Sequence, residues 1–124
     1  MLNLNSVMLS SSDYQRLADF YGKVLQKKPD MEEKEHSAVG YLAGSCFITL
    51  CSHDKVHGKS LNPERVILFF ETREVEDEFN RIKEIPGASV IREPYKVGGA
   101  KKAVIATLAD PDGNYFQLAT PWNG

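Results

Sequence analysis

The chain has 124 residues, of which 42% are hydrophobic and 26% charged, which is the composition of an ordinary folded protein. The formal net charge is -2, so we expect neither a nucleic-acid partner nor an anionic membrane partner, both of which attract strongly basic chains. Residues 1–13 show no basic leader and no long apolar run. We therefore expect no signal peptide and no membrane span.

Cysteine usage points to a reducing compartment. Cys46 and Cys51 lie in one strand-like run, an odd number of positions apart, so that alternation directs them to opposite faces and a disulfide between them is unfavourable. We expect free thiols and a cytoplasmic location.

The first half of the chain predicts a strand, a helix and two or three further strands. Residues 4–11 have the pattern of a strand, and Asp13 then caps a helix over residues 14–26. The apolar stripe of this helix consists of Leu17, Phe20, Tyr21 and Val24. After a charged segment come strand-like residues 38–43 and 45–52, with Gly44 in the turn between them.

The second half repeats this order. Residues 65–71 have a strand pattern, and Thr72 then caps a helix over residues 73–85, whose apolar residues at helical spacing are Val75, Phe79 and Ile82. Strands over residues 88–96 and 102–109 follow, and the type I turn Asp110–Gly113 leads into a last strand over residues 114–120.

Both halves thus have the order β-α-β-β-β, and matching elements lie about sixty residues apart, which indicates an internal duplication. We predict an α+β fold in a single domain of residues 1–124, with βαβββ modules over residues 1–52 and 64–124 and a linker over residues 53–63. Helices covering one face of each module would leave an open, curled mixed β-sheet around a groove. The alternative is a single mixed sheet whose halves are alike by chance.

Three stretches carry a resemblance to a known superfamily: LADPDGNYFQLATP near the end, DYQRLADFYGKVL after the first strand, and REPYKVGGAKKAVIA before the turn. The chain is similar over nearly its whole length to the vicinal-oxygen-chelate superfamily, which includes glyoxalase I, bleomycin-resistance proteins and extradiol dioxygenases. The resemblance implies paired βαβββ modules that curl into an open barrel, a homodimer, and a ligand bound in the groove.

For the metal-dependent members, the resemblance implies His, Glu or Gln ligands on the first and last strands of each module. The matching positions here are Ser6, Thr49, Ile67 (or its neighbour Val66) and Gln117. Only Gln117 among them could bind a metal. A catalytic ion needs about three ligands drawn from imidazole, thiolate and carboxylate, so we predict no metal and no cofactor.

Other candidate ligands have simpler interpretations. His53 and His57 have the spacing of a ligand pair on a helix, but they lie in the linker, so we interpret them as solvated loop residues. His36 follows an acidic run and is interpreted as a surface residue at a strand edge.

The glycine-containing loop KVGGAKK could cradle an anion between Lys96, Lys101 and Lys102. An exposed hairpin connection is the simpler interpretation. A weak preference for acidic ligands stays open.

The last strand gives the main functional prediction. Alternation places Tyr115 and Gln117 on one face of this strand, and Phe116 and Leu118 on the face that meets the helix. If Gln117 faces the groove, the predicted ligand-binding residues are Ser6, Met8, Thr49, Ile67, Phe69, Tyr115 and Gln117. A mostly apolar surface with a few hydrogen-bonding groups is typical of small-molecule sites. Alternatively, these side chains fill a closed barrel.

Together with the resemblance, these residues predict a metal-free, homodimeric small-molecule-binding protein similar to bleomycin-resistance proteins, which sequesters an organic ligand. Whether any reaction is catalysed stays open. The alternatives are a glyoxalase- or dioxygenase-like enzyme whose metal ligands lie elsewhere, and a metal-independent lyase or isomerase that uses a base in the groove.

Overall fold

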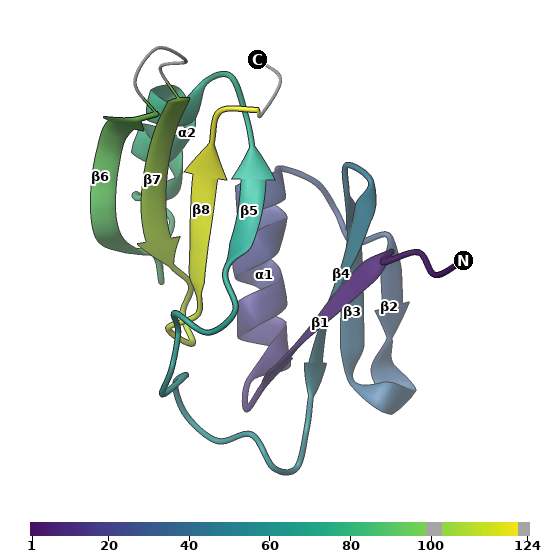
Figure 1. Ribbon diagram of the computed structural model, residues 1–124. Coiled ribbons are helices and arrows are strands. Elements are labelled where there is room, and N and C mark those ends of the chain that lie inside the picture. Colours follow the sequence, from purple (N-terminus) through teal and green to yellow (C-terminus); the bar gives the residue numbers. More distant parts are fainter. Residues whose placement is uncertain (99–102, 122–124) are drawn as a thin grey trace. The chain divides into compact units, whose positions relative to one another are not determined.

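The computed structural model describes residues 1–98 and 103–121 and divides into two compact units, Met1–Gly58 (unit 1) and Lys59–Gly124 (unit 2). Among the described residues, each unit contains a strand, a helix and three further strands in that order (Figure 1). The predicted α+β fold and β-α-β-β-β order are confirmed. The division falls inside the predicted linker, while the exact module bounds stay a prediction.

Unit 1 forms a four-stranded sheet in the order β1-β4-β3-β2, in which β1 is parallel to β4 and the other neighbours are antiparallel. Its elements are β1 (Ser6–Ser11), α1 (Tyr14–Leu25), β2 (Met31–Glu33), the 3₁₀ helix η1 (Lys34–His36), β3 (Ala38–Ala43) and β4 (Cys46–Ser52). His36 therefore lies in a helical turn and not at a strand edge, because the chain turns here before β3. Cys46 and Cys51 are free thiols, as expected.

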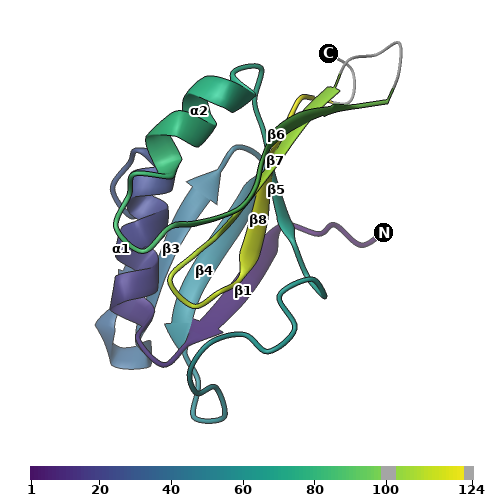
Figure 2. The same cartoon turned by 90° about the vertical axis from the view of Figure 1, so that its left-hand side faces the viewer.

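Helix α1 packs against one face of this sheet (Figure 2). It begins as predicted, because the carboxylate of Asp13 accepts a hydrogen bond from the backbone N–H of Arg16 at 3.2 Å. The hydroxyl of Tyr41 on β3 donates to the backbone oxygen of Ala18 at 2.8 Å. The predicted stripe is buried and forms the core with the sheet: Leu17, Phe20, Tyr21 and Val24.

Unit 2 has the equivalent sheet order, β5-β8-β7-β6, with β5 parallel to β8 and the other neighbours antiparallel. Its elements are β5 (Leu68–Glu71), α2 (Val75–Ile82), β6 (Ser89–Val97), β7 (Ala103–Ala109) and β8 (Tyr115–Ala119). Helix α2 covers one face of the sheet (Figure 2). On that face Phe116 is buried, and its ring meets the ring of Phe70 edge to face, with centroids 5.9 Å apart.

Strand β5 starts later than predicted. The backbone N–H of Arg65 donates to the carbonyl of Asn62 at 3.0 Å, so the chain still turns where we expected a strand. The first ladder pair joins Leu68 to Phe116, near the start of β8. Ile67 therefore precedes the strand.

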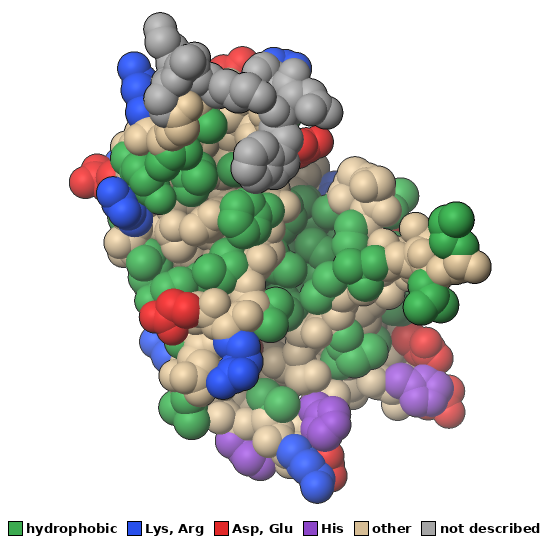
Figure 3. All heavy atoms as spheres, in the orientation of Figure 1, with side chains coloured by type: hydrophobic (Ala, Val, Ile, Leu, Met, Phe, Trp, Pro, Cys, Tyr) green, Lys and Arg blue, Asp and Glu red, His purple; other side chains and the backbone are tan. Residues whose placement is uncertain are grey.

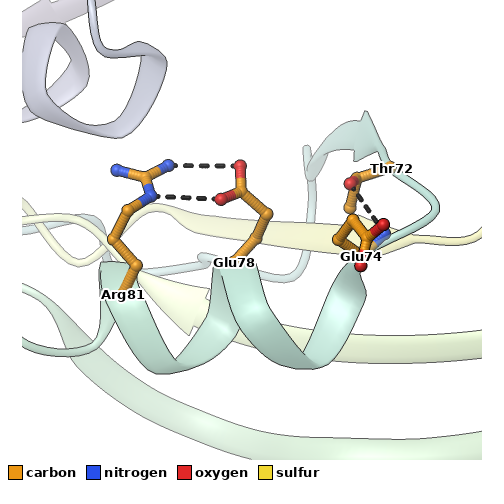
Figure 4. A network of polar contacts seen from close by, with 4 residues as sticks. All are labelled: Thr72, Glu74, Glu78 and Arg81. Carbon is orange, nitrogen blue, oxygen red and sulfur yellow. Dashed lines mark hydrogen bonds and ion pairs between the residues drawn. The ribbon is translucent and has the colours of Figure 1, made fainter.

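Helix α2 also starts later than predicted. Thr72 was expected to cap it, but the N-cap position is Glu74, whose side chain makes no capping bond. The Thr72 hydroxyl instead accepts the backbone N–H of Glu74 at 3.0 Å (Figure 4), a local bond that competes with helix formation. An acidic first turn complements the helix dipole in place of a cap; its residues are Glu76, Asp77 and Glu78.

The remaining features of α2 agree with the sequence pattern. Its predicted apolar residues are buried: Val75, Phe79 and Ile82. Arg81 donates two hydrogen bonds to the carboxylate of Glu78, at 3.1 and 3.2 Å (Figure 4). Within the described residues, neither helix is long and apolar enough to cross a membrane.

The predicted turn before β8 is built around one carboxylate. The backbone N–H of Gly113 donates to the carbonyl of Asp110 at 2.9 Å, which closes the turn. The Oδ1 atom of Asp110 accepts the backbone N–H groups of Asp112 and Asn114, at 2.9 and 3.0 Å. These bonds fix where β8 begins, and so fix the position of Gln117.

Candidate functional site

The helix-free face of each unit, meaning the face of its sheet opposite its own helix, carries most of the predicted ligand-binding residues. In unit 1, Thr49 lies between Ile48 and Leu50, which are both buried on the helix side, so Thr49 points to the helix-free face. The ladder places Met8 beside Thr49. Met8 is 66% exposed, so an apolar side chain stands open next to a hydroxyl.

Phe47 and Gly40 also lie on this face, and neither was identified from the sequence. Ser6 pairs with Phe47, and Gly40 pairs with Thr49. A Cβ atom built on Gly40 would overlap the ring of Phe47, so this glycine makes room for the ring to lie over the sheet. A glycine inside a strand pattern often marks the close approach of another group, so Gly40 could have been identified from the sequence.

In unit 2 the ladder produces one row of side chains across the helix-free face: Phe69, Gln117, Thr107 and Arg92. The side-chain amide nitrogen of Gln117 donates to the hydroxyl of Thr107 at 3.1 Å. Thr107 is only 7% exposed, whereas Phe69 is 63% exposed. The amide is thus held in one orientation beside an exposed aromatic ring.

Three other residues of unit 2 were predicted as candidates for binding, and Tyr115 among them has the expected orientation. Tyr115 precedes Gln117 by two positions in β8 and shares its face. Ile67 lies before β5 and is half-buried, so no ladder pair fixes its direction. Lys96 pairs with Val104 and points to the helix side; its two partners in the proposed anion loop, Lys101 and Lys102, lie outside the described residues.

Arg92 is the most informative residue that the sequence did not reveal. Its guanidinium carbon lies 3.6 Å from the centre of the Tyr95 ring. In a regular strand, residues three positions apart point to opposite faces. Here the pairing of β6 shifts on both sides of Arg92, so that Arg92 pairs with Thr107 and Tyr95 with Ile105. Period-two alternation does not predict such bulges.

Figure 3, in the orientation of Figure 1, looks onto the helix-free face of unit 2. Hydrophobic side chains cover much of it, and charged side chains lie along β6. Glu71 shares this face with Phe69: it is exposed at the end of β5, beside Ala119 and two residues after Phe69. The face therefore has a cation on one edge strand, an anion on the other, and both hydrogen-bonding and apolar side chains between them.

The residues at the superfamily's metal-ligand positions do not fit a transition-metal ion. Ser6 and Thr49 offer neutral hydroxyls, and the Ile67 side chain has no atom that could bind a metal. Gln117 offers an amide that is already bonded to Thr107. None is an imidazole, thiolate or carboxylate, the groups that offset the lost hydration of such an ion. Nowhere in the described chain do three His, Cys, Asp or Glu residues gather closely enough to hold a metal.

The three histidines lie outside the strands. His53 and His57 are exposed in the segment between β4 and β5, as predicted. His36 is exposed too, and its Nδ1 atom lies 2.6 Å from a carboxylate oxygen of Glu33.

Comparisons with known proteins identify what the chain resembles. A family model described as a glyoxalase-like domain matches residues 6–119. A glyoxalase-related enzyme from Fulvimarina pelagi is 16% identical, with 98% of this chain and 89% of that chain covered and a TM-score of 0.77. A glyoxalase/bleomycin resistance protein from Albidiferax ferrireducens T118 is 19% identical, with 94% and 98% covered and a TM-score of 0.73.

A third solved structure is a glyoxalase/bleomycin resistance protein/dioxygenase family enzyme from Burkholderia phytofirmans PsJN, with 22% identity, 96% and 98% covered and a TM-score of 0.72. Likeness at these identities establishes the fold alone. No curated protein matches the chain in sequence.

Proposed function

The chain belongs to the glyoxalase-like domain family, within the vicinal-oxygen-chelate superfamily, and from this premise we propose that it binds a small organic molecule without a metal ion. The ligand lies against the helix-free face of unit 2 and is held, not converted. Since one scaffold hosts many activities, the proposal depends on the residues of the face and not on the fold.

The row that contains Gln117 carries the proposal. The nitrogen of its side-chain amide donates to the hydroxyl of Thr107, which leaves the amide oxygen to accept a hydrogen bond from a ligand. The exposed ring of Phe69 lies beside it on β5, and Tyr115 flanks it on β8. A fixed polar group among aromatic side chains orients an apolar molecule and gives it specificity.

The donor set supports binding without a metal. A zinc or iron centre of this superfamily would need ligands that Ser6, Thr49, Ile67 and Gln117 do not supply. Calorimetric titration of the protein with Zn²⁺, Ni²⁺ and Fe²⁺ is expected to show no tight binding that depends on Gln117. Micromolar or tighter binding that is lost in Gln117→Ala would overturn the proposal in favour of a metal-dependent enzyme.

The ligand face is tested with the neutral fluorescent probe N-phenyl-1-naphthylamine. We expect saturable binding to the wild type, weakened about fivefold by Phe69→Ala through lost apolar contact and also weakened by Gln117→Ala. Leu61→Ala is the matched control, because Leu61 is also an exposed apolar side chain but lies outside the strands. Equal effects of all three substitutions, or no saturable binding, would refute the site.

Two further expectations belong to this proposal. The free thiols of Cys46 and Cys51 support a cytoplasmic location, where disulfides are rare. The exposed side chain of Met8 on the helix-free face of unit 1 supports a homodimer, in which a second chain would cover apolar surface.

A further inference from the structure

We propose that the ligand of the unit 2 helix-free face is an organic anion, with an acidic group bound by Arg92 and a flat apolar body lying toward Phe69. This inference rests on the proposed function, because it specifies the chemical class bound at the same face. It concerns Arg92, which does not lie at any of the positions that match the superfamily's metal ligands.

Arg92 is available for an anion. In the described part of the chain its guanidinium has no carboxylate partner and lies over the ring of Tyr95. A guanidinium stacked on an aromatic ring keeps its N–H groups in one plane, directed outward from the ring edge. Those donors match the two oxygens of a carboxylate or sulfonate group.

The backbone is shaped to place this arginine on the face. The bulge between Arg92 and Tyr95 contains Pro94, which an edge strand tolerates. Without the extra residue the two side chains would point to opposite faces, and the stack could not form. Bulges often re-aim a side chain next to a functional site, and here the result is a cation in the same row as Gln117.

The charges across the sheet fix the direction of the ligand. Arg92 lies on β6 and Glu71 on β5, at opposite edges of the four-stranded sheet. An acidic group is attracted to the first and repelled by the second. Three strand spacings separate β6 from β5, about 14 Å, so a molecule of two or three fused or linked rings would reach from Arg92 across Gln117 to Phe69.

The experiment compares two probes with almost the same aromatic body. 1-Anilinonaphthalene-8-sulfonate carries an acidic group, and N-phenyl-1-naphthylamine is its neutral counterpart. Fluorescence titration of Arg92→Gln is expected to show about tenfold weaker binding of the sulfonate, in line with the loss of one charge-assisted contact. Binding of the neutral probe should be unchanged.

Lys96→Gln is the matched control. It removes one positive charge from the same strand, but Lys96 points to the other side of the sheet, where it lines a hollow of about 430 Å³ between α2 and β6. This variant should leave both probes unaffected. Tyr95→Leu should weaken sulfonate binding less than Arg92→Gln does. Tyr95→Phe should bind the sulfonate as the wild type does, because it keeps the ring that positions the guanidinium. Circular dichroism and thermal unfolding establish that each variant is folded.

The outcomes separate this inference from the proposed function. If Arg92→Gln weakens both probes equally or neither, or if Lys96→Gln acts like Arg92→Gln, the acidic-ligand inference is wrong, while the response of the neutral probe to Phe69→Ala still supports the binding face. If neither probe binds the wild type saturably, both proposals fail.

Discussion

Tyr41 and Gly22 illustrate how single residues fix α1 on its sheet. The Tyr41 hydroxyl donates to the Ala18 carbonyl, and a Cβ atom on Gly22 would lie 2.6 Å from that hydroxyl oxygen. Burial raises the pKa of the Tyr41 phenol, and the charges of Asp19 and Glu32 act in the same direction. The phenol is therefore held neutral as a hydrogen-bond donor.

Gly22→Ala is expected to destabilise unit 1 by about 1 to 2 kcal/mol, although alanine is the better helix former. Tyr41→Phe alone should cost about 1 kcal/mol through the lost hydrogen bond. Because Tyr41→Phe removes the atom that the new methyl group would strike, the double variant should lose less than the sum of the two. Urea unfolding of all four proteins measures this coupling; strict additivity would contradict the contact.

Asp30 supplies a pH-dependent contribution to stability. The Lys27 side chain lies 2.6 Å from its Oδ2 atom, and the backbone N–H of Leu42 donates to the same atom at 2.7 Å. The hydrogen bond from Lys27 has the larger influence and lowers the pKa of Asp30, and the hydrogen bond from Leu42 acts in the same direction. A lowered folded-state pKa means that the stabilisation is complete above the pKa of the unfolded chain and is lost as the pH falls through the folded value.

Asp30→Asn should therefore have a slightly lower melting temperature than the wild type at pH 7. The effect is small because the carboxylate is exposed and solvent screens its pair with Lys27. The two curves should converge in acid, below the ordinary pKa of an aspartate near 3.9. Added salt should narrow the difference at pH 7. A difference that grows as the pH falls would contradict the assignment.

At the scale of elements, the Asp110 turn positions β8. Asp110→Ala leaves the backbone N–H groups of Asp112 and Asn114 without their acceptor, and we expect a loss of about 3 kcal/mol in urea unfolding. Asp112→Asn is the control in the same turn, because the Oδ2 atom of Asp112 is buried without a hydrogen-bond partner. Its effect should be much smaller. Comparable losses would show that charge, and not the turn bonds, matters here.

The elements differ in how far their sequence predicts them. The two helices follow from apolar side chains at helical spacing, such as Phe20 and Phe79, because this local pattern survives in the folded chain. The start of α2 does not follow, because the Thr72 hydroxyl bonds the backbone two residues on instead of serving as the cap. Signals for caps and turns use the same residue types, and the sequence does not distinguish them.

The candidate site divides in the same way. Alternation correctly places Gln117 opposite Phe116, since β8 is regular. The place of Arg92 depends on how β6 pairs with β7, a tertiary property that shifts the parity of the strand. The sequence therefore predicts the face on which Gln117 lies, but it does not predict that Arg92 pairs with Thr107 on the same face.

At the scale of the whole molecule, we propose that two chains associate through apolar surface around Met8 on the helix-free face of unit 1. Sedimentation velocity is expected to show a species with twice the mass of one chain. Met8→Glu should shift it toward the monomer, because burying an unpaired charge is costly, whereas Leu61→Glu should not. A wild-type protein that stays monomeric at high concentration would rule out the dimer.

The parallel pairing of the first and last strands in each unit has a consequence for synthesis. Ser10 on β1 and Cys51 on β4 are 41 positions apart, so at translation rates of about 5–20 residues per second β1 waits roughly 2 to 8 seconds for its neighbour. During that interval Val7 and Leu9 have no sheet to pack in, and β1 is open to chaperones. In unit 2, a ribosome that stalls before Tyr115 would leave β5 without its sole ladder partner among the described strands.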